Sequence, residues 1–375
     1  MTRSETLFRR RGARMAALVL AFLCCCAAHA TVRAQGGTEH LIAEVQGRVE
    51  VKRAGWHNFV RAAVGMLVKN GDLLQLAERA SAKVTCADLS VRNVSERSYR
   101  VRCGSNSPVM RFKGARYSRL RTGNAIATFP VLISPRMTKL LDPRPTLRWT
   151  PMNGATSYRV SIMRGSVEHW AQEVTGVTEL KYPEGAPPLV PGVTYKAVIS
   201  VGLRNTGEEG APNLGFAVLS QEQARGVREA ENKIRELRLS ETATKLLIAN
   251  LYATWGVNQE NLRDDTWALS AEAIELLEGA SPEAAVLRLL GDLYLSLGLA
   301  DLAEARHLRA LKAAEAAGDT QGEALAQFAL GRIYTVRLNS DEAARRFQAA
   351  RELFQSFGDA VSAEKAASEL AELQK

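Results

Sequence analysis

The C-terminal part of the chain places apolar residues at every third or fourth position, which puts them on one face of an α-helix. From residue 221 on, proline nearly disappears, and Ala, Leu and Glu become frequent. Glycines stand where the apolar pattern stops, as they do at helix ends. The pattern predicts eight helices, near 221–238, 241–255, 264–278, 282–297, 300–317, 321–337, 341–357 and 360–374.

Two earlier regions, 40–105 and 141–203, instead alternate apolar and polar residues, which is typical of half-buried β-strands. The alternating runs are Val45, Gly47, Val49 and Val51; Ala82, Val84 and Cys86; Tyr99, Val101 and Cys103; Leu147 and Trp149; Tyr158, Val160 and Ile162; and Tyr195, Ala197, Ile199 and Val201. Gly71-Asp72 marks a tight turn between strands. We therefore expect a multidomain chain with two small all-β modules followed by an all-α domain.

The helical part repeats itself after forty residues. Leu290–Tyr294 (Leu-Gly-Asp-Leu-Tyr) returns as Leu330–Tyr334 (Leu-Gly-Arg-Ile-Tyr), and Gly318-Asp319 returns as Gly358-Asp359. Such a period predicts stacked helical hairpins, because one hairpin cannot bury its apolar face alone. We expect an all-α solenoid with a binding surface on its inner side.

These repeated residues resemble the tetratricopeptide repeat. Small residues such as Ala303 and Ala343 allow helices to approach closely, and Tyr294 and Tyr334 fill the space between them. The resemblance implies a protein partner along the first helix of each pair. Carried over by register, the candidate partner-binding residues are Leu246, Asn250, Arg288, Asp292, Phe328 and Arg332. The subgroup that grips C-terminal peptides has Lys in place of Leu246, so that activity is not expected.

Both β regions also resemble known modules. The first resembles the FecR-like extracytoplasmic domain in Val45-x-Gly47-x-Val49-x-Val51, Trp56, Gly65-x-Leu67, Gly71-Asp72 and Ser81-Ala82. The second is similar to a fibronectin type III or immunoglobulin-like sandwich in Pro145-x-Leu147-x-Trp149, Ala155-x-x-Tyr158-x-Val160, Trp170, Leu180 and Pro191-Gly192-x-x-Tyr195. The expected domains are a FecR-like domain with a basic extension at 36–140, the sandwich at 141–220 and the repeats at 221–375.

Residues 1–34 have the pattern of a bacterial export signal. Arg9-Arg10-Arg11 gives a cationic start, Met15–Ala28 is apolar, and Ala28-His29-Ala30 fits a small-x-small cleavage site. An apolar run this short is less than the roughly 20 residues of a transmembrane helix. We expect an exported protein of the periplasm or cell envelope with at most peripheral membrane contact. Cleavage of the signal, or its retention as a short anchor, stays open.

Beyond the signal, Cys86 and Cys103 are the two cysteines of the chain. A pair in an exported chain indicates a disulfide, which at this spacing would stabilise the fold by roughly 3 kcal/mol. Two buried thiols are the alternative. The pair lacks a Cys-x-x-Cys spacing and has no His near it in the sequence, so no metal site is predicted.

The net charge of +9 is unevenly distributed. Residues 36–140 hold eighteen Lys and Arg against seven Asp and Glu, whereas residues 221–375 are acidic. The densest basic cluster, with aromatic residues between its cations, is Arg111, Lys113, Arg116, Arg119 and Arg121. Such a pattern suits nucleic acid, but export argues against that partner. The candidates are an anionic envelope polymer or lipid head group, or an ordinary solvated surface.

Motifs of catalysis are missing from the sequence. It has no Gly-x-Ser-x-Gly elbow, phosphate loop, dinucleotide fingerprint or His-Glu-x-x-His helix. Glu168 and His169 are adjacent on a predicted strand and would face opposite sides. We expect no cofactor and no enzyme activity, but an envelope scaffold whose β modules dock on an envelope component and whose helical groove holds a protein. The alternative is a FecR-like sensor or anchor that binds an anionic wall polymer and signals through the repeats.

Overall fold

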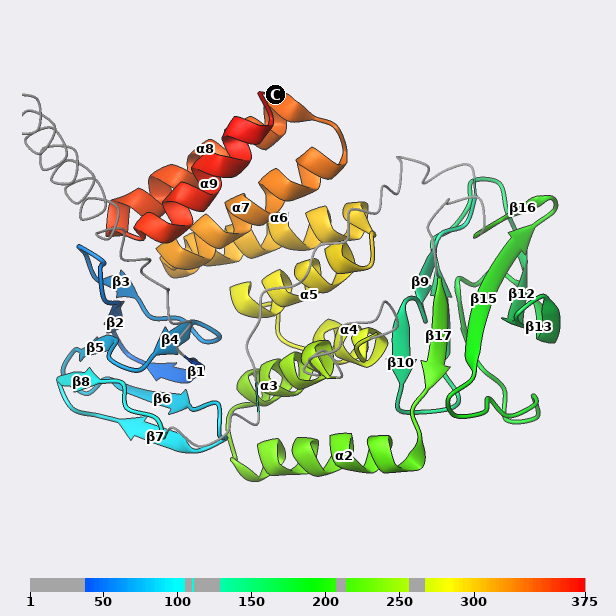
Figure 1. The fold of residues 1–375 in the computed structure, drawn as a ribbon, viewed down its shortest axis with the longest axis horizontal. Coiled ribbons are helices and arrows are strands. Elements are labelled where there is room, and N and C mark those ends of the chain that lie inside the picture. Colours follow the sequence, from blue (N-terminus) through cyan, green and yellow to red (C-terminus); the bar gives the residue numbers. More distant parts are fainter. Residues whose placement is uncertain (1–37, 105–109, 111–128, 207–213, 256–266, 375) are drawn as a thin grey trace, which may run out of the picture. The chain divides into compact units, whose positions relative to one another are not determined.

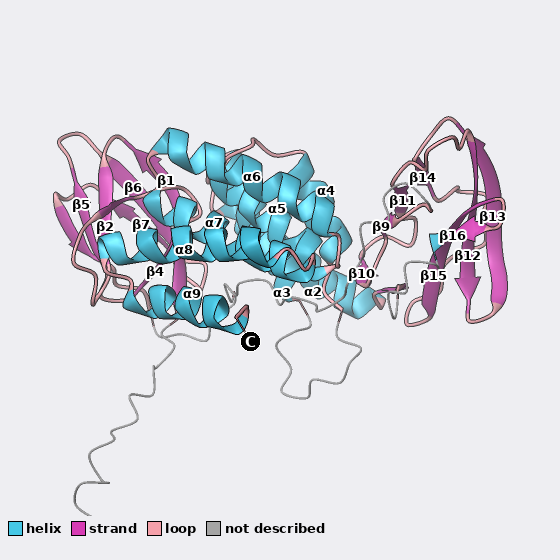
Figure 2. Ribbon diagram, turned by 90° about the horizontal axis from the view of Figure 1, so that it is seen from above, coloured by secondary structure: helices cyan, strands magenta, loops and turns pink. Residues whose placement is uncertain are grey.

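The computed structural model describes residues 38–104, 110, 129–206, 214–255 and 267–374. In this part of the chain, all strands precede all helices (Figure 1), in agreement with the hydrophobic pattern. Figure 2 distinguishes the strands from the helices by colour. None of the helices described is long and apolar enough to cross a bilayer. Residues from Thr38 onward form one compact unit.

The first β region contains two four-stranded sheets, with strand orders β4-β1-β6-β7 and β3-β2-β5-β8. Every pairing in them is antiparallel, and alternate side chains fill a shared core that includes Ile42, Val51, Leu74 and Val84. The strands are β1 (Glu39–Gln46), β2 (Val49–Lys52), β3 (Val60–Arg61), β4 (Leu67–Lys69), β5 (Leu73–Leu76), β6 (Ser81–Thr85), β7 (Val91–Val94) and β8 (Ser98–Arg100).

The run from Val45 to Val51, predicted as one strand, is two strands in the structure. β1 ends at Gln46 and β2 begins at Val49. Gly47 between them has φ +74°, and a Cβ there would lie 3.1 Å from the Cβ of Ala80. Gly47 therefore lies in a turn rather than in an extended strand. Glycine suits this position because the backbone is left-handed and a side chain would be crowded by Ala80.

Strand β4 lies at the edge of its sheet, and the side chains of Arg53 and Asp72 cap that edge. Leu67 and Lys69 belong to the non-hydrogen-bonded pairs of the β1–β4 ladder. Their backbone N–H and C=O groups therefore point away from β1. Arg53 donates to the Leu67 carbonyl, and Asp72 accepts from the Lys69 amide at 2.8 Å. The two side chains also form an ion pair, with Arg53 Nε 3.5 Å from an Asp72 oxygen.

The two cysteines form the expected disulfide. Cys86 follows β6, Cys103 follows β8, and their Cα atoms are 5.7 Å apart. Cys86 is buried and Cys103 is half-buried.

The second β region has one sheet ordered β10-β17-β15-β12-β13, with β16 beside β15, and another ordered β14-β11-β9. Because β9 and β10 pair with β11 and β17, this region begins at Leu132 rather than at 141. The strands are β9 (Leu132–Ser134), β10 (Thr138–Leu140), β11 (Thr146–Trp149), β12 (Ser157–Arg164), β13 (Val167–Thr175), β14 (Glu179–Lys181), β15 (Thr194–Val201), β16 (Arg204–Asn205) and β17 (Gly215–Val218).

The helices agree closely with the predicted ranges, except that the third begins at Ser270 rather than near 264. Those described are α2 (Gln221–Glu236), α3 (Glu241–Thr254), α4 (Ser270–Glu278), α5 (Ala284–Ser296), α6 (Ala300–Ala317), α7 (Thr320–Val336), α8 (Ser340–Phe357) and α9 (Ala360–Glu372). Ser220 forms a capping box with Gln223, and Gly318 and Gly358 end α6 and α8 in the left-handed conformation. Consecutive helices from α5 to α9 pack against each other (Figure 1).

The repeated glycine of the Leu-Gly-x-x-Tyr motif has a packing reason. A Cβ on Gly291 would lie 2.7 Å from the His307 ring, and a Cβ on Gly331 would lie 2.6 Å from the Phe347 ring. Both pairs are separated by sixteen residues, so the same contact recurs in consecutive repeats. His307 is fully buried and acts as the packed ring of its repeat.

The second β region is joined to α4 through β10. The Lys139 amide donates to the Ala268 carbonyl at 2.9 Å, and the Leu141 amide donates to Glu272 Oε1 at 2.6 Å. From α4, Glu278 pairs with Arg148 of β11 at 2.5 Å and accepts from the hydroxyl of Tyr294. A carboxylate of α4 thus links β11 to α5.

We expect the Glu272 carboxyl to make this junction sensitive to pH. Its Oε2 is buried without a hydrogen-bond partner among the described residues, and burial raises its pKa to about 7. The folded protein therefore holds this proton more tightly than the unfolded chain, so stability falls as the pH rises from about 4.5 to about 7. Glu272→Gln should remove that fall and be more stable than wild type by about 2–3 kcal/mol at pH 8.

Urea unfolding of both proteins at pH 5 and pH 8 measures this difference. Glu229→Gln, at an exposed position of α2, is the control and should keep the wild-type pH dependence. Equal pH dependence in wild type and Glu272→Gln would contradict the assignment.

Candidate functional site

The six residues predicted to bind a partner line one cavity of about 510 Å³. They come in pairs from three helices: Leu246 and Asn250 from α3, Arg288 and Asp292 from α5, and Phe328 and Arg332 from α7. Helix α9 adds Ser362 and Lys365 to the lining. The equivalent repeat positions 250, 292 and 332 therefore line the same cavity.

The opposite wall of this cavity belongs to the first β region. Glu39 and Leu41 of β1, Arg53, and the segment from Gly65 to Leu67 line it. Gly65 lies so close to α5 that a Cβ there would be 2.4 Å from the Cβ of Ala285. The predicted groove of the helices is therefore covered along part of its length by the chain's own strands.

Further contacts hold the β region on the helices at the end of α8. The His57 amide donates to the Phe357 carbonyl at 3.0 Å, and Asn58 Nδ2 donates to the Ser356 carbonyl at 2.8 Å. The Trp56 ring lies against the Phe357 ring with centroids 4.7 Å apart. At the other end, Glu44 accepts from the Ser240 amide at 2.7 Å. Direct contacts thus hold the first β region against the end of α8 and against Ser240, which precedes α3.

Two of the six residues serve mainly as packing. Leu246 is 2% exposed and Phe328 is 8% exposed. Leu246 approaches Gly65, and Phe328 joins the core that the first β region shares with α7 and α8. The half-buried polar residues Asn250, Arg288, Asp292 and Arg332 remain as the groups that can contact a ligand.

Two cations of the cavity lie near the same aromatic ring. The guanidinium carbon of Arg332 is 5.1 Å and Lys365 Nζ is 5.2 Å from the centroid of the Phe328 ring. Arg332 also pairs with Glu369 of α9 through its Nε at 3.0 Å. Partial desolvation and the Arg332 charge lower the pKa of Lys365. An anion placed here would relieve the repulsion between the two cations.

The remaining charges of the cavity are partly compensated. Asp292 lies 3.4 Å from His307 Nε2. Asp319 lies outside the cavity lining but near Arg288: burial raises the pKa of Asp319, and the charge of Arg288 opposes that rise. On the β side, burial raises the pKa of Glu39, which Lys69 and Arg53 oppose. The helical side thus carries Arg288, Arg332 and Lys365 together with Asp292 and Asp359, and the β side carries Glu39 and Arg53, so the lining has four cations and three carboxylates.

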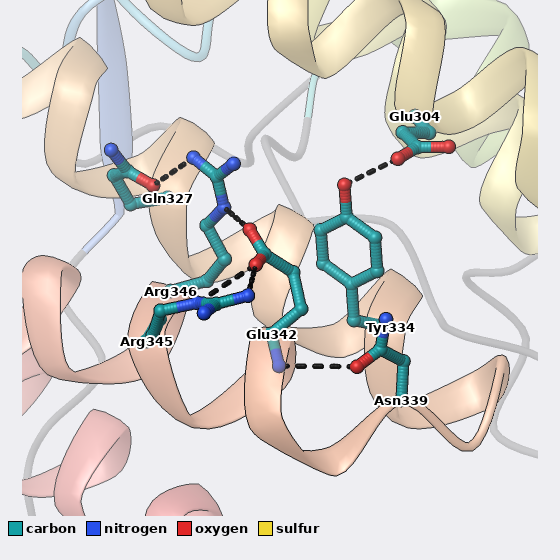
Figure 3. Close-up of polar contacts among 7 residues, drawn as sticks. All are labelled: Glu304, Gln327, Tyr334, Asn339, Glu342, Arg345 and Arg346. Atoms are coloured by element: carbon teal, nitrogen blue, oxygen red, sulfur yellow. Dashed lines mark hydrogen bonds and ion pairs between the residues drawn. The ribbon is translucent and has the colours of Figure 1, made fainter.

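Polar groups on another part of the helices pair with each other instead. Figure 3 shows Arg346 between Gln327 and Glu342, with Nη1–Oε1 and Nε–Oε1 distances of 3.1 and 2.7 Å. Arg345 also contacts Glu342, and the Tyr334 hydroxyl donates to Glu304. These contacts join α6, α7 and α8. The polar groups involved are already paired with one another and are therefore poor candidates for binding a ligand.

The sequence also pointed to a basic cluster and to the adjacent residues Glu168 and His169. The basic residues Arg111, Lys113, Arg116, Arg119 and Arg121 lie outside the described residues. On β13, Glu168 pairs with Arg159 at 2.9 Å, whereas His169 lies against the Tyr195 ring at 5.2 Å. Neighbours on this strand thus have separate surroundings, as predicted.

The cavity residues Glu39, Arg53, Gly65 and Lys365 were not found from the sequence. The first three belong to another domain, and no repeat pattern points to them. Lys365 could have been found by continuing the helical register into α9. Neither the protein-family models nor the curated proteins compared with this chain give a match.

Proposed function

We propose that the protein is a non-enzymatic scaffold of the bacterial cell envelope, and that the cavity between its repeat helices and its first β region holds a segment of a protein partner. The main support for this proposal is that the six residues chosen by repeat register line one cavity. The resemblance to tetratricopeptide repeats supports a protein ligand, and the export signal and disulfide support the compartment.

The size of the cavity favours a short extended segment. A volume of about 510 Å³ lies in the range of about 300–1,000 Å³ that is usual for small ligand sites. Because Leu246 and Phe328 are already packed, the ligand would use the half-buried polar residues and the open part of the apolar lining. A whole helix laid against α3, α5 and α7 would collide with the strands that line the opposite wall.

The charges favour an acidic group on that segment. Arg332 and Lys365 approach the same ring, and Arg288 lies on the neighbouring repeat. A carboxylate accepts charge-assisted hydrogen bonds from such groups, with Arg able to give two in parallel. We propose a segment with an Asp or Glu side chain directed at these cations, while the β modules dock on an envelope component.

Photo-crosslinking in the producing bacterium identifies the partner. A photoreactive residue at Asn250 should give a specific crosslinked protein, and one at the exposed Arg309 of α6 should not. Crosslinks to polysaccharide alone would instead favour the sensor that binds a wall polymer. The absence of any crosslink that depends on the Asn250 position would contradict the proposal.

The double variant Asn250→Ala/Arg288→Ala should bind the purified partner at least about tenfold more weakly, a loss of about 1.4 kcal/mol. Its free energy of unfolding should fall by less than about 2 kcal/mol, because both side chains are half-buried and the loss of Arg288 leaves the charge of Asp319 less compensated. Calorimetric titration measures the affinity. Arg309→Ala, an exposed arginine on α6, is the matched control and should bind like wild type.

A further inference from the structure

A buried histidine lies beside the disulfide of the first β region. One ligand atom each from His40, Cys86 and Cys103 lies within 4.8 Å of the other two. Among the described residues this is the one group of three or more His, Cys, Asp or Glu close enough to hold a metal ion. In the sequence, His40 stands far from either cysteine, so no spacing motif reveals the cluster.

The sheet places His40 next to Cys86. The ladder between β1 and β6 pairs Leu41 with Thr85, which makes His40 and Cys86 the next cross-strand neighbours. His40 is 1% exposed, and its imidazole is of the kind that most often binds metals in proteins. Nδ1 accepts from the Ala87 amide at 3.2 Å, while Nε2 is buried without a hydrogen-bond partner among the described residues.

The cysteines are held in place by bonds that do not involve sulfur. The Cys103 amide donates to Asn70 Oδ1 at 2.7 Å, and Asn70 Nδ2 donates to the Cys103 carbonyl at 3.2 Å. The Cys86 amide donates to the Ser90 carbonyl at 2.8 Å. Reduction of the disulfide therefore leaves both thiols beside the imidazole.

We propose that the reduced Cys86–Cys103 pair and His40 form a zinc site, so that this corner of the domain can be closed either by a disulfide or by a metal ion. A dithiol reductant supplies two electrons and two protons to the disulfide and becomes a disulfide itself. Zn²⁺ then binds the two thiolates and displaces their two protons. His40 Nε2 is the third ligand, and water completes the four positions that zinc prefers.

The geometry suits this metal. Two thiolates at the usual Zn–S distance of about 2.3 Å lie about 3.8 Å apart in a tetrahedron. Cysteines with Cα atoms 5.7 Å apart reach that separation by side-chain rotation. Coordination moves the imidazole proton to Nδ1 and gives up the Ala87 bond, a small loss beside the binding free energy of a structural zinc site. Cys103 is half-buried, which gives the ion a route inward.

Cobalt and zinc titrations of the whole chain, with Cys24, Cys25 and Cys26 replaced by Ser so that Cys86 and Cys103 are its two cysteines, test the proposal. Protein reduced with a phosphine and desalted under argon should bind one Co²⁺ per chain with a thiolate charge-transfer band, and Zn²⁺ should displace it. Oxidised protein should bind none. His40→Ala should weaken zinc binding by about 10- to 100-fold or more. His57→Ala, an exposed histidine of the same β region, should bind like wild type.

Circular dichroism checks that each reduced protein is folded. Reduced, folded wild type that binds no zinc at micromolar concentration would overturn the proposal, as would equal zinc affinities of wild type and His40→Ala. Should His40→Ala fail to fold, X-ray absorption of zinc-loaded wild type decides. Two sulfur scatterers with one imidazole support the site, and sulfur without imidazole refutes it.

Discussion

Replacing Trp56 by Ala should lower the free energy of unfolding by about 3–5 kcal/mol, the usual loss for a large buried aromatic residue. Trp56 is 6% exposed, packs against Phe357 of α8 and carries the Arg53 guanidinium 5.1 Å from its ring. The variant loses these contacts in the core that the β region shares with α7 and α8. Urea unfolding followed by circular dichroism measures the change.

Trp56→Phe is the matched control for this experiment. It keeps an aromatic ring against Phe357 and should lose less than half as much stability as Trp56→Ala. A loss below 1 kcal/mol in Trp56→Ala would mean that Trp56 does not join the β region to α8 in solution. Faster proteolysis between the β region and the helices in Trp56→Ala would support the interpretation.

Replacing Gly65 by Ala should destabilise the protein by about 2–5 kcal/mol in total. The backbone at Gly65 has φ +83°, where a Cβ is strained by about 1–2 kcal/mol. The new methyl group would also lie 2.4 Å from the Cβ of Ala285, and such overpacking adds about 1–3 kcal/mol. Thermal and urea unfolding give the loss.

Gly71→Ala separates the two contributions. Gly71 has φ +96° but no atom within 4 Å of its ideal Cβ, so its variant should show the backbone strain alone. Adding Ala285→Gly to Gly65→Ala should recover part of the loss, with a coupling of at least about 0.5 kcal/mol between the two positions. Equal losses in Gly65→Ala and Gly71→Ala, with no coupling to position 285, would show that the strands do not touch α5.

Sequence periodicity predicted the helices well because their apolar residues recur with a fixed spacing and their ends carry glycine. The strands were predicted less accurately. Around Gly47 the alternation of apolar and polar residues continues through a turn. The alternation therefore does not reveal the left-handed backbone that separates β1 from β2. Residues 132–140 join the second β region because β10 pairs with β17, which follows it by many residues.

The candidate site shows the same division. The residues of its helical side can be chosen by register, because equivalent positions of stacked repeats are expected to face the same way. Its β side depends on how one domain docks on another. The sequence around residues such as Glu39 and Arg53 contains no pattern that indicates this docking. The same holds for His40, which reaches the cysteines only through the pairing of β1 with β6.

The capped edge of β4 has a consequence for handling the protein at high concentration. An uncovered strand edge invites the backbone of another molecule, and from there ordered aggregates grow. With the Leu67 carbonyl taken by Arg53 and the Lys69 amide by Asp72, no incoming chain can extend the sheet there without first breaking an ion pair. Acid or an Asp72→Ala exchange would uncover the edge, and light scattering should then record growing particles where the native chain stays dispersed.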